Sequence, residues 1–270
     1  MAFLPKEDIV KDKFNVLVLD TECHFMSEHN KMVYDIGWIF GDIRNMTSAV
    51  KERRFIIKEF LSPKHWRHSF IDKETKKRKD WKWDLRGDDL VNLSHNPPKG
   101  VKVVFWNEML EVLKQDIAMV EGVGSYNWQF DRGAIENTSL KLNHEPFLQK
   151  LDFKPFCILD MYVNKIINRD YFTYIDALES WERDLFKSKS GKNLGYSAEI
   201  MARYCARFYH YIEEHSSLMD SRVEFNLTRL FCDKHFTAFK TEFLNNPKSV
   251  SWTKIRDRLS SAEKMKKRTG

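Results

Sequence analysis

Cysteine is scarce in this chain and widely spaced where it occurs. The four cysteines among the 270 residues are Cys23, Cys157, Cys205 and Cys232, and no two of them form a Cys-x-x-Cys pair. Zinc knuckles need such paired ligands, and disulfide-stapled domains need many cysteines in a short chain. The spacing therefore indicates neither a structural zinc site nor a disulfide framework.

Long apolar runs are missing as well. No segment holds the roughly 20 consecutive apolar residues that a membrane-spanning helix needs. The N-terminal segment MAFLPKEDIVKDKF carries charges throughout and has no apolar stretch of the kind found in signal peptides. We expect a soluble, cytoplasmic protein with no membrane partner.

Internal repeats and low-complexity linkers are also absent, so nothing separates two globular domains. The hydrophobic fraction of 42% and the aromatic fraction of 14% are enough for a sizeable core in one large domain. Between residues 62 and 100 the pattern dissolves into charge, tryptophan and proline, as in an insertion or a long functional loop. We expect one domain over residues 1–245, interrupted by an insertion at 62–100 and followed by a basic tail at 246–270.

The periodicity that is present predicts strands first and helices later. Strands of apolar and β-branched residues separated by polar turns form an antiparallel meander, and helical and extended segments then alternate. The predicted strands lie near Asn15–Leu19, Met32–Phe40, Arg53–Phe60, Met119–Ser125 and Pro155–Asp160, and the predicted helices begin near Val104, Asn127 and Met161, with further helices beyond. This order predicts an α/β fold, in which a mixed five-stranded sheet is flanked by helices.

Two carboxylates follow the first strand, in the stretch NVLVLDTECHF. Val16 to Leu19 are apolar on both faces, which indicates a strand buried at the centre of a sheet. Side chains alternate along a strand, so Asp20 and Glu22 share one face, about 7 Å apart. Two like charges beside a buried strand are costly unless a positive charge lies between them.

Two further carboxylates fall on the apolar faces of predicted helices. Asp131 shares a stripe with Trp128 and Ile135, and Asp220 lies one turn before a core stripe of Val223, Leu227, Leu230 and Phe231. Each acid alone fits a strand end or the first turn of a helix, where the dipole favours it. Together, the four resemble a cage of hard oxygen ligands for divalent cations, Mg²⁺ or Mn²⁺.

These residues fall into motifs that resemble the DEDDh family of 3′–5′ exonucleases. The family's Asp-x-Glu motif matches DTE at Asp20 to Glu22, Asn-x-x-Phe-Asp matches NWQFD at Asn127 to Asp131, and His-x-x-x-x-Asp matches HSSLMD at His215 to Asp220. The stretch YDIGWIF resembles the family's second strand. The resemblance spans roughly residues 14–236 and implies an RNase H-like fold.

The resemblance also implies a mechanism with two divalent cations, Mg²⁺ or Mn²⁺. Asp20 would bridge both ions, Glu22 and Asp220 would bind the one that activates water, and Asp131 would reach the other. His215, flanked by polar residues, would be the general base, a role suited to a pKa near neutrality. The implied reaction is hydrolysis of phosphodiester bonds in single-stranded DNA or RNA, releasing nucleoside monophosphates.

We expect the substrate to contact residues in and beside these motifs: Thr21, Cys23, Asn127 and Phe130. Cys23 departs from the family, which usually has Thr or Gly at this position close to the terminal nucleotide. The insertion adds the basic and aromatic segment KETKKRKDWKW, in which Lys79 would meet phosphate and Trp81 or Trp83 would stack a base. Its other interpretation is a solvated hairpin with the tryptophans packed inward.

The net charge of +6 is compatible with a polyanionic partner but does not decide among functions. One alternative is an inactive nucleic-acid-binding protein that has kept the fold, although such a protein gains nothing from buried acids. Another is a replication-complex protein whose insertion or tail docks on a protein partner. The sequence does not distinguish DNA from RNA and does not indicate an oligomeric state.

Overall fold

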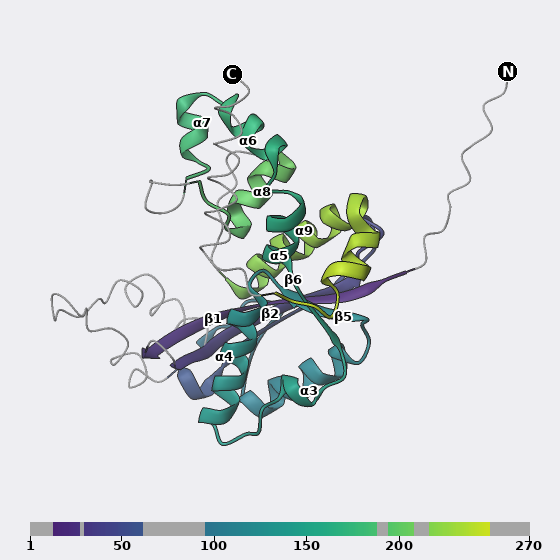
Figure 1. The fold of residues 1–270 in the computed structure, drawn as a ribbon. Coiled ribbons are helices and arrows are strands. Elements are labelled where there is room, and N and C mark those ends of the chain that lie inside the picture. Colours follow the sequence, from purple (N-terminus) through teal and green to yellow (C-terminus); the bar gives the residue numbers. More distant parts are fainter. Residues whose placement is uncertain (1–12, 28–29, 62–94, 188–193, 208–215, 249–270) are drawn as a thin grey trace.

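The structure is a computed structural model, and it describes residues 13–27, 30–61, 95–187, 194–207 and 216–248. These residues form a six-stranded mixed sheet in the order β4-β3-β2-β1-β5-β6, with helices on both faces (Figure 1). The strands are β1 (Asn15–Ser27), β2 (Asn30–Asp42), β3 (Lys51–Ile57), β4 (Val101–Val104), β5 (Gly122–Ser125) and β6 (Lys154–Cys157). The predicted α/β class is confirmed.

The first three strands form the predicted antiparallel meander. β1 pairs with β2 and β2 pairs with β3 in antiparallel register, whereas β4, β5 and β6 are each parallel to a neighbour. The four apolar residues Val16 to Leu19 are fully buried. This confirms that β1 lies at the centre of the sheet and is covered on both faces.

The predicted number of five strands is wrong. The segment Val101–Val104 forms the edge strand β4, and the following helix starts only at Trp106. Its burial is partial, and four residues of edge strand give too short an alternation to separate from the helical pattern that follows. The loop predicted after the first strand is wrong too, because β1 continues to Ser27 and β2 begins at Asn30, forming a long hairpin.

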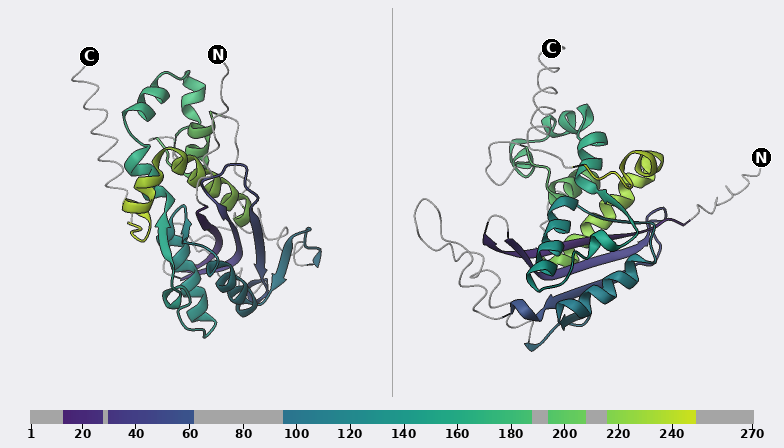
Figure 2. Two further views of the ribbon diagram at one scale, coloured as in Figure 1. Left: turned by 90° about the vertical axis from the view of Figure 1, so that its right-hand side faces the viewer. Right: turned by 60° about the horizontal axis from the view of Figure 1, so that its bottom comes forward.

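Helices cover the sheet in two layers. α3 (Trp106–Ile117) and α4 (Trp128–Lys141) lie on one face, and α5 (Ile158–Lys165) and α9 (Ser217–Ala238) lie on the other (Figures 1 and 2). The remaining helices stand further out, beyond α5 and α9 (Figure 1): α6 (Arg169–Asp176), α7 (Ser180–Asp184) and α8 (Ala198–Ala206). The described residues also contain two short 3₁₀ helices, Lys58–Phe60 and Leu148–Lys150, and a π-helical turn, Phe239–Phe243.

Large aromatic side chains fill the space between sheet and helices. Trp38 of β2 stacks on Phe55 with ring centroids 5.0 Å apart and donates from Nε1 to Asp116 Oδ2 at 2.8 Å. Trp106 of α3 is fully buried and donates to Ser139 Oγ of α4 at 3.1 Å. The hydrogen bonds offset the cost of burying both indole N–H groups.

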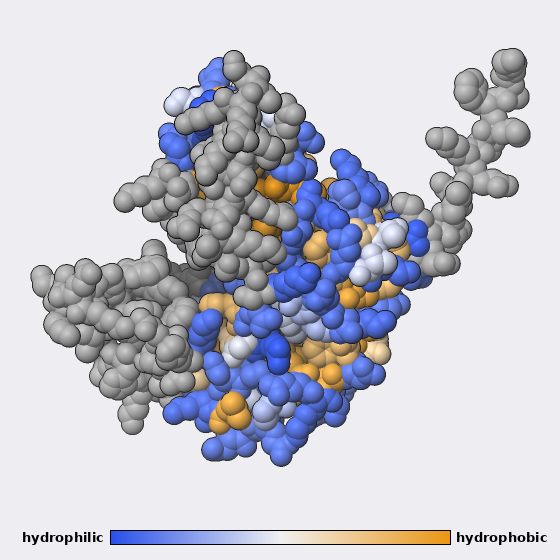
Figure 3. All heavy atoms as spheres, in the orientation of Figure 1, coloured by the Kyte–Doolittle hydropathy of each residue, from blue (hydrophilic) through white to orange (hydrophobic). Residues whose placement is uncertain are grey.

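The surface of the described residues is mainly hydrophilic on the face shown in Figure 3, where apolar side chains form small separate areas. None of the helices in the described ranges is long and apolar enough to cross a membrane. The insertion predicted at 62–100 lies outside the described residues up to residue 94, and so does the predicted tail beyond residue 248. The domain boundaries at residues 245 and 246 stay predictions.

Candidate metal centre

Three carboxylates meet where β1 passes the start of α9. One oxygen of Asp20, one of Glu22 and one of Asp220 all lie within 4.8 Å of one another. Asp20 and Glu22 share a face of β1 by strand alternation, and a β-bulge follows directly, between Glu22 and Cys23. Three hard oxygen donors at this separation suit Mg²⁺ or Mn²⁺ better than a soft-ligand metal.

Asp220 reaches this point because α9 packs very closely against β2. Gly37 pairs directly with Asp20 across the hairpin, and a Cβ atom on Gly37 would stand 2.5 Å from the backbone nitrogen of Leu218 in α9. Ser221 Oγ donates to the carbonyl of Gly37 at 2.9 Å. Only glycine at position 37 therefore allows the first turn of α9 to lie so close to β2, at the residue that pairs with Asp20.

A buried polar network holds the start of α9 in this position. Ser217 Oγ donates to Asp35 Oδ1 at 2.5 Å, and Arg54 donates to both oxygens of Asp35 at 3.2 and 2.8 Å. Asp35 lies opposite Glu22 in the hairpin register and is 2% exposed. The guanidinium group of Arg54 binds both carboxylate oxygens of Asp35 and so compensates its buried charge. Asp35 therefore holds the start of α9 and does not belong to the group of three carboxylates.

Asp131 approaches the same middle part of β1, at Thr21, from the other face of the sheet. It lies in the first turn of α4, is 3% exposed, and its Oδ1 accepts hydrogen bonds from the backbone N–H of Thr21 at 3.2 Å and from Thr21 Oγ1 at 2.7 Å. Burial raises the pKa of Asp131 to about 6. It adjoins the three carboxylates without belonging to the group that lies within 4.8 Å.

Glu224 is a buried carboxylate of the site that the motifs do not predict. It lies one turn after Asp220 in α9 and is 3% exposed. Burial raises the pKa of Asp20, and the charge of Glu224 raises it further, ahead of Asp131, Glu22 and Asp220. All four acids therefore lie close enough to Asp20 to act on its charge.

The helix pattern contained a signal for Glu224. The predicted core stripe of α9 is partly wrong, because Leu230 is 37% exposed and Val223 is only partly buried. The buried residues Asp220, Glu224, Leu227 and Phe231 follow i, i+4, i+7 and i+11. Charged residues are rarely buried without a partner, so a glutamate on the buried stripe of a helix indicates a candidate functional site.

Lys31 is the second residue that the sequence did not single out. Its ammonium group lies 3.6 Å from the centroid of the Phe130 ring. Burial lowers the pKa of Lys31, and the charge of the nearby Asp131 carboxylate opposes this shift. Lys31 therefore brings a positive charge to the side of the site formed by α4, and it was missed because the sequence predicted a loop up to residue 31.

The other predicted site residues have mixed placements. Thr21 and Cys23 are buried, and Thr21 uses its hydroxyl to hold Asp131. Asn127 is exposed at the N-cap of α4, and Phe130 is half-buried. Their substrate contacts stay predictions. The predicted base His215 lies outside the described residues, as do Lys79, Trp81 and Trp83.

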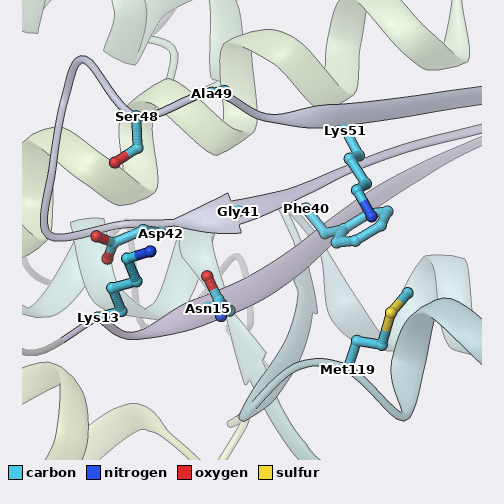
Figure 4. A pocket seen from close by; sticks show the side chains of 9 residues that line it. All are labelled: Lys13, Asn15, Phe40, Gly41, Asp42, Ser48, Ala49, Lys51 and Met119. Atoms are coloured by element: carbon cyan, nitrogen blue, oxygen red, sulfur yellow. The ribbon is translucent and has the colours of Figure 1, made fainter.

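A separate open pocket of about 380 Å³ lies at the N-terminal end of β1, away from the carboxylates (Figure 4). Side chains from the start of β1, the end of β2 and the start of β3 line it, among them Lys13, Asn15, Phe40, Asp42 and Lys51. The carboxylate in this lining, Asp42, accepts the backbone N–H groups of Phe14 and Arg44 at 3.1 and 2.9 Å. The pocket is thus no part of the carboxylate centre.

Comparison with known proteins supports the fold. No family model and no curated protein sequence matches the chain. Exonuclease I from Methylocaldum szegediense matches it with a TM-score of 0.51 and 12% identity, over 84% of this chain and 42% of that one. E. coli Exonuclease I in complex with a dT13 oligonucleotide matches with a TM-score of 0.50 and 10% identity, over 84% and 43%. The chain shares the fold of these exonucleases.

At this level of identity, the likeness concerns the fold. It agrees with the RNase H-like arrangement predicted from the motifs, a mixed sheet with helices on both faces. The chain spans less than half the length of either matched structure.

Proposed function

We propose that this protein is a metal-dependent 3′–5′ exonuclease of the DEDDh type, which hydrolyses phosphodiester bonds of single-stranded DNA or RNA and releases nucleoside monophosphates. The observation that carries the proposal is the convergence of Asp20, Glu22 and Asp220, with ligand oxygens within 4.8 Å. Like charges at this separation disfavour their own ionisation, and bound cations reverse that effect. The residue types fit a divalent cation, since every donor is a carboxylate oxygen.

Asp20, Glu22 and Asp220 would hold two cations, Mg²⁺ or Mn²⁺, together with Asp131 from the other face of β1. When bound, such ions stabilise the charge on a phosphodiester and make water a better nucleophile. His215 would accept the proton of the attacking water, and its position five residues before Asp220 supports this role.

Lys31 and Phe130 would contact the substrate beside the carboxylates. Lys31 is partly exposed, and its ammonium group lies over the Phe130 ring, within reach of the charge of Asp131. A lysine at the rim of an acidic centre offers phosphate a compensating charge, and an aromatic ring offers a base a stacking surface. Single-stranded DNA is supported as a substrate by the oligonucleotide in the matched E. coli Exonuclease I complex.

The test must separate an enzyme from a binding protein with the same fold. Asp20→Asn removes one charge at the centre and retains the shape of the side chain. We expect cleavage of single-stranded DNA to fall by at least about 100-fold, while binding measured by fluorescence anisotropy in Ca²⁺ is retained. Equal cleavage by wild type and variant would reject the proposal, as would binding by wild type with no cleavage in Mg²⁺ or Mn²⁺.

A further inference from the structure

Glu224 occupies a place that the proposed set of ligands leaves unexplained. It follows Asp220 by four residues in α9, and this spacing puts both side chains on one helix face, roughly 6 Å apart at Cβ. The side chain is 3% exposed, and a glutamate is almost never buried to this degree without a specific compensating interaction. Its burial on the face that carries Asp220 therefore requires a local cause.

One cause is a hydrogen bond to the segment that precedes Asp131. Glu224 Oε2 accepts the backbone N–H of Tyr126 at 3.0 Å, directly after β5 ends and before α4 begins. The carbonyl of the same Tyr126 accepts the N–H of Leu159 at 2.9 Å. The backbone of Tyr126 is therefore held at both its N–H and its carbonyl, and Glu224 connects α9 to the segment just before α4.

The charge of Glu224 has a separate consequence. Glu224 lies one helical turn after Asp220 and is buried like it, although its oxygens do not belong to the group of three within 4.8 Å. A carboxylate just outside a set of ligands makes the site more attractive to a cation without occupying a coordination position. Its burial therefore adds to the demand for positive charge at the centre.

We propose that Glu224 is a fifth carboxylate of the metal centre, a positioning residue that fixes α4 against α9 and strengthens cation binding by Asp20, Glu22 and Asp220. This inference rests on the proposed function. It assigns two separable roles to one side chain: the hydrogen bond positions Asp131, and the charge sets the affinity for the cation.

Two variants separate these roles. Glu224→Gln keeps an oxygen that accepts from Tyr126 and loses the charge, whereas Glu224→Asp keeps the charge and retracts the oxygen from Tyr126. Glu136→Gln is the matched control, because Glu136 of α4 is buried and accepts the backbone N–H groups of Phe147 and Gln149 at 2.7 and 3.1 Å. Circular dichroism first confirms that each variant is folded.

The primary readout is Mn²⁺ binding to the full chain, measured by electron paramagnetic resonance without substrate. We expect Glu224→Gln to weaken Mn²⁺ binding by about 10- to 100-fold, and Glu224→Asp and Glu136→Gln to stay within about threefold of wild type. The activity of Glu224→Gln should be recovered by raising Mn²⁺, whereas that of Glu224→Asp should not.

Mn²⁺ affinity of Glu224→Gln equal to wild type would overturn the inference and leave the proposed function intact. Equal losses in Glu224→Gln and Glu224→Asp would overturn it too, because they would indicate packing alone. If Glu224→Gln does not fold, Glu224→Asp provides the test. Its Mn²⁺ affinity must then lie within about threefold of wild type, and a larger loss would overturn the inference. Absence of Mn²⁺ binding by wild type would reject the proposed function as well.

Discussion

At the scale of single residues, Asp131 shows how burial raises the affinity of a carboxylate for a proton. Its carboxylate is buried against Thr21, and burial raises its pKa from 3.8 to about 6. The pKa of Asp20 is raised in the same direction by burial and by neighbouring acids. Without a cation, the folded protein therefore holds protons that the unfolded chain has already released.

The raised pKa of Asp131 predicts the direction in which the stability of the folded protein changes with pH. The contribution of Asp131 is fully present below about pH 4 and is lost as the pH rises through about 6. In EDTA, the melting temperature should fall between about pH 4 and 6, and the fall should be smaller in Asp131→Asn and in Mg²⁺. Thermal melts at fixed ionic strength measure this. An identical pH profile for wild type and Asp131→Asn would contradict the raised pKa.

Lys31 allows a second prediction at this scale. Lys31→Met removes the charge next to Asp131 and keeps an apolar side chain over Phe130. We expect KM for single-stranded DNA to rise severalfold with a smaller change in kcat. The slope of the logarithm of the binding constant against the logarithm of the salt concentration should become shallower by about one. Lys51→Met is the control, because Lys51 also lies over a phenylalanine, Phe40, at the other end of the sheet. Equal effects of the two substitutions would exclude a specific role.

The sequence predicted part of the site at this scale, for a definite reason. Asp20, Glu22 and Asp220 belong to local motifs, and the structure brings these three together. Glu224 and Lys31 belong to no motif. The helical stripe of α9 places Glu224 on the buried face, but its contact with Tyr126 and the position of Lys31 near Asp131 appear only when α9 and β2 pack beside β1. Contacts between residues far apart in sequence, such as Glu224 with Tyr126, have no local signature.

At the scale of elements, the contact between β2 and α9 determines where Asp220 lies. Gly37→Ala would place a Cβ atom 2.5 Å from the backbone of Leu218, so α9 must move away from β2. A displacement of about 1 Å at a catalytic group costs roughly 100-fold in rate. We therefore expect cleavage to fall at least about 100-fold in this variant.

Gly133→Ala is the matched control for that substitution. A Cβ atom on Gly133 of α4 meets nothing within 4 Å, and alanine favours a helix over glycine by about 1 kcal/mol. This variant should keep wild-type activity and melt at the same temperature or higher. Activity of Gly37→Ala close to that of Gly133→Ala would contradict the role of the close contact.

The elements themselves were partly predictable. The strands β1 and β2 follow from apolar periodicity, and their antiparallel pairing follows from the meander pattern. The edge strand β4 and the extension of β1 through residues 23–27 were not predicted, because polar residues in a hairpin resemble a loop when its partner strand is unknown. Whether such a segment forms a strand depends on its pairing with another strand, which its own sequence does not show.

At the scale of the whole molecule, the carboxylate centre lies where the two helical layers meet the middle of β1, at residues 20–22. α4 brings Asp131 from one face of the sheet and α9 brings Asp220 from the other (Figure 1). The order of the three motifs along the chain predicted this fold, and the matched Exonuclease I structures share it. The arrangement of α6, α7 and α8 was not predicted, since helical periodicity gives the faces of helices but not their neighbours.

The most direct test of the central claim is cleavage of single-stranded DNA of one sequence, labelled in parallel at the 5′ or the 3′ end. In Mg²⁺ or Mn²⁺, the 5′-labelled strand should give a ladder that shortens one nucleotide at a time, and the 3′-labelled strand should release a labelled mononucleotide at once. EDTA should abolish both, and RNA of equal sequence shows which sugar is preferred. Internal fragments, release from the 5′ end, or cleavage that persists in EDTA would contradict a two-metal 3′–5′ exonuclease.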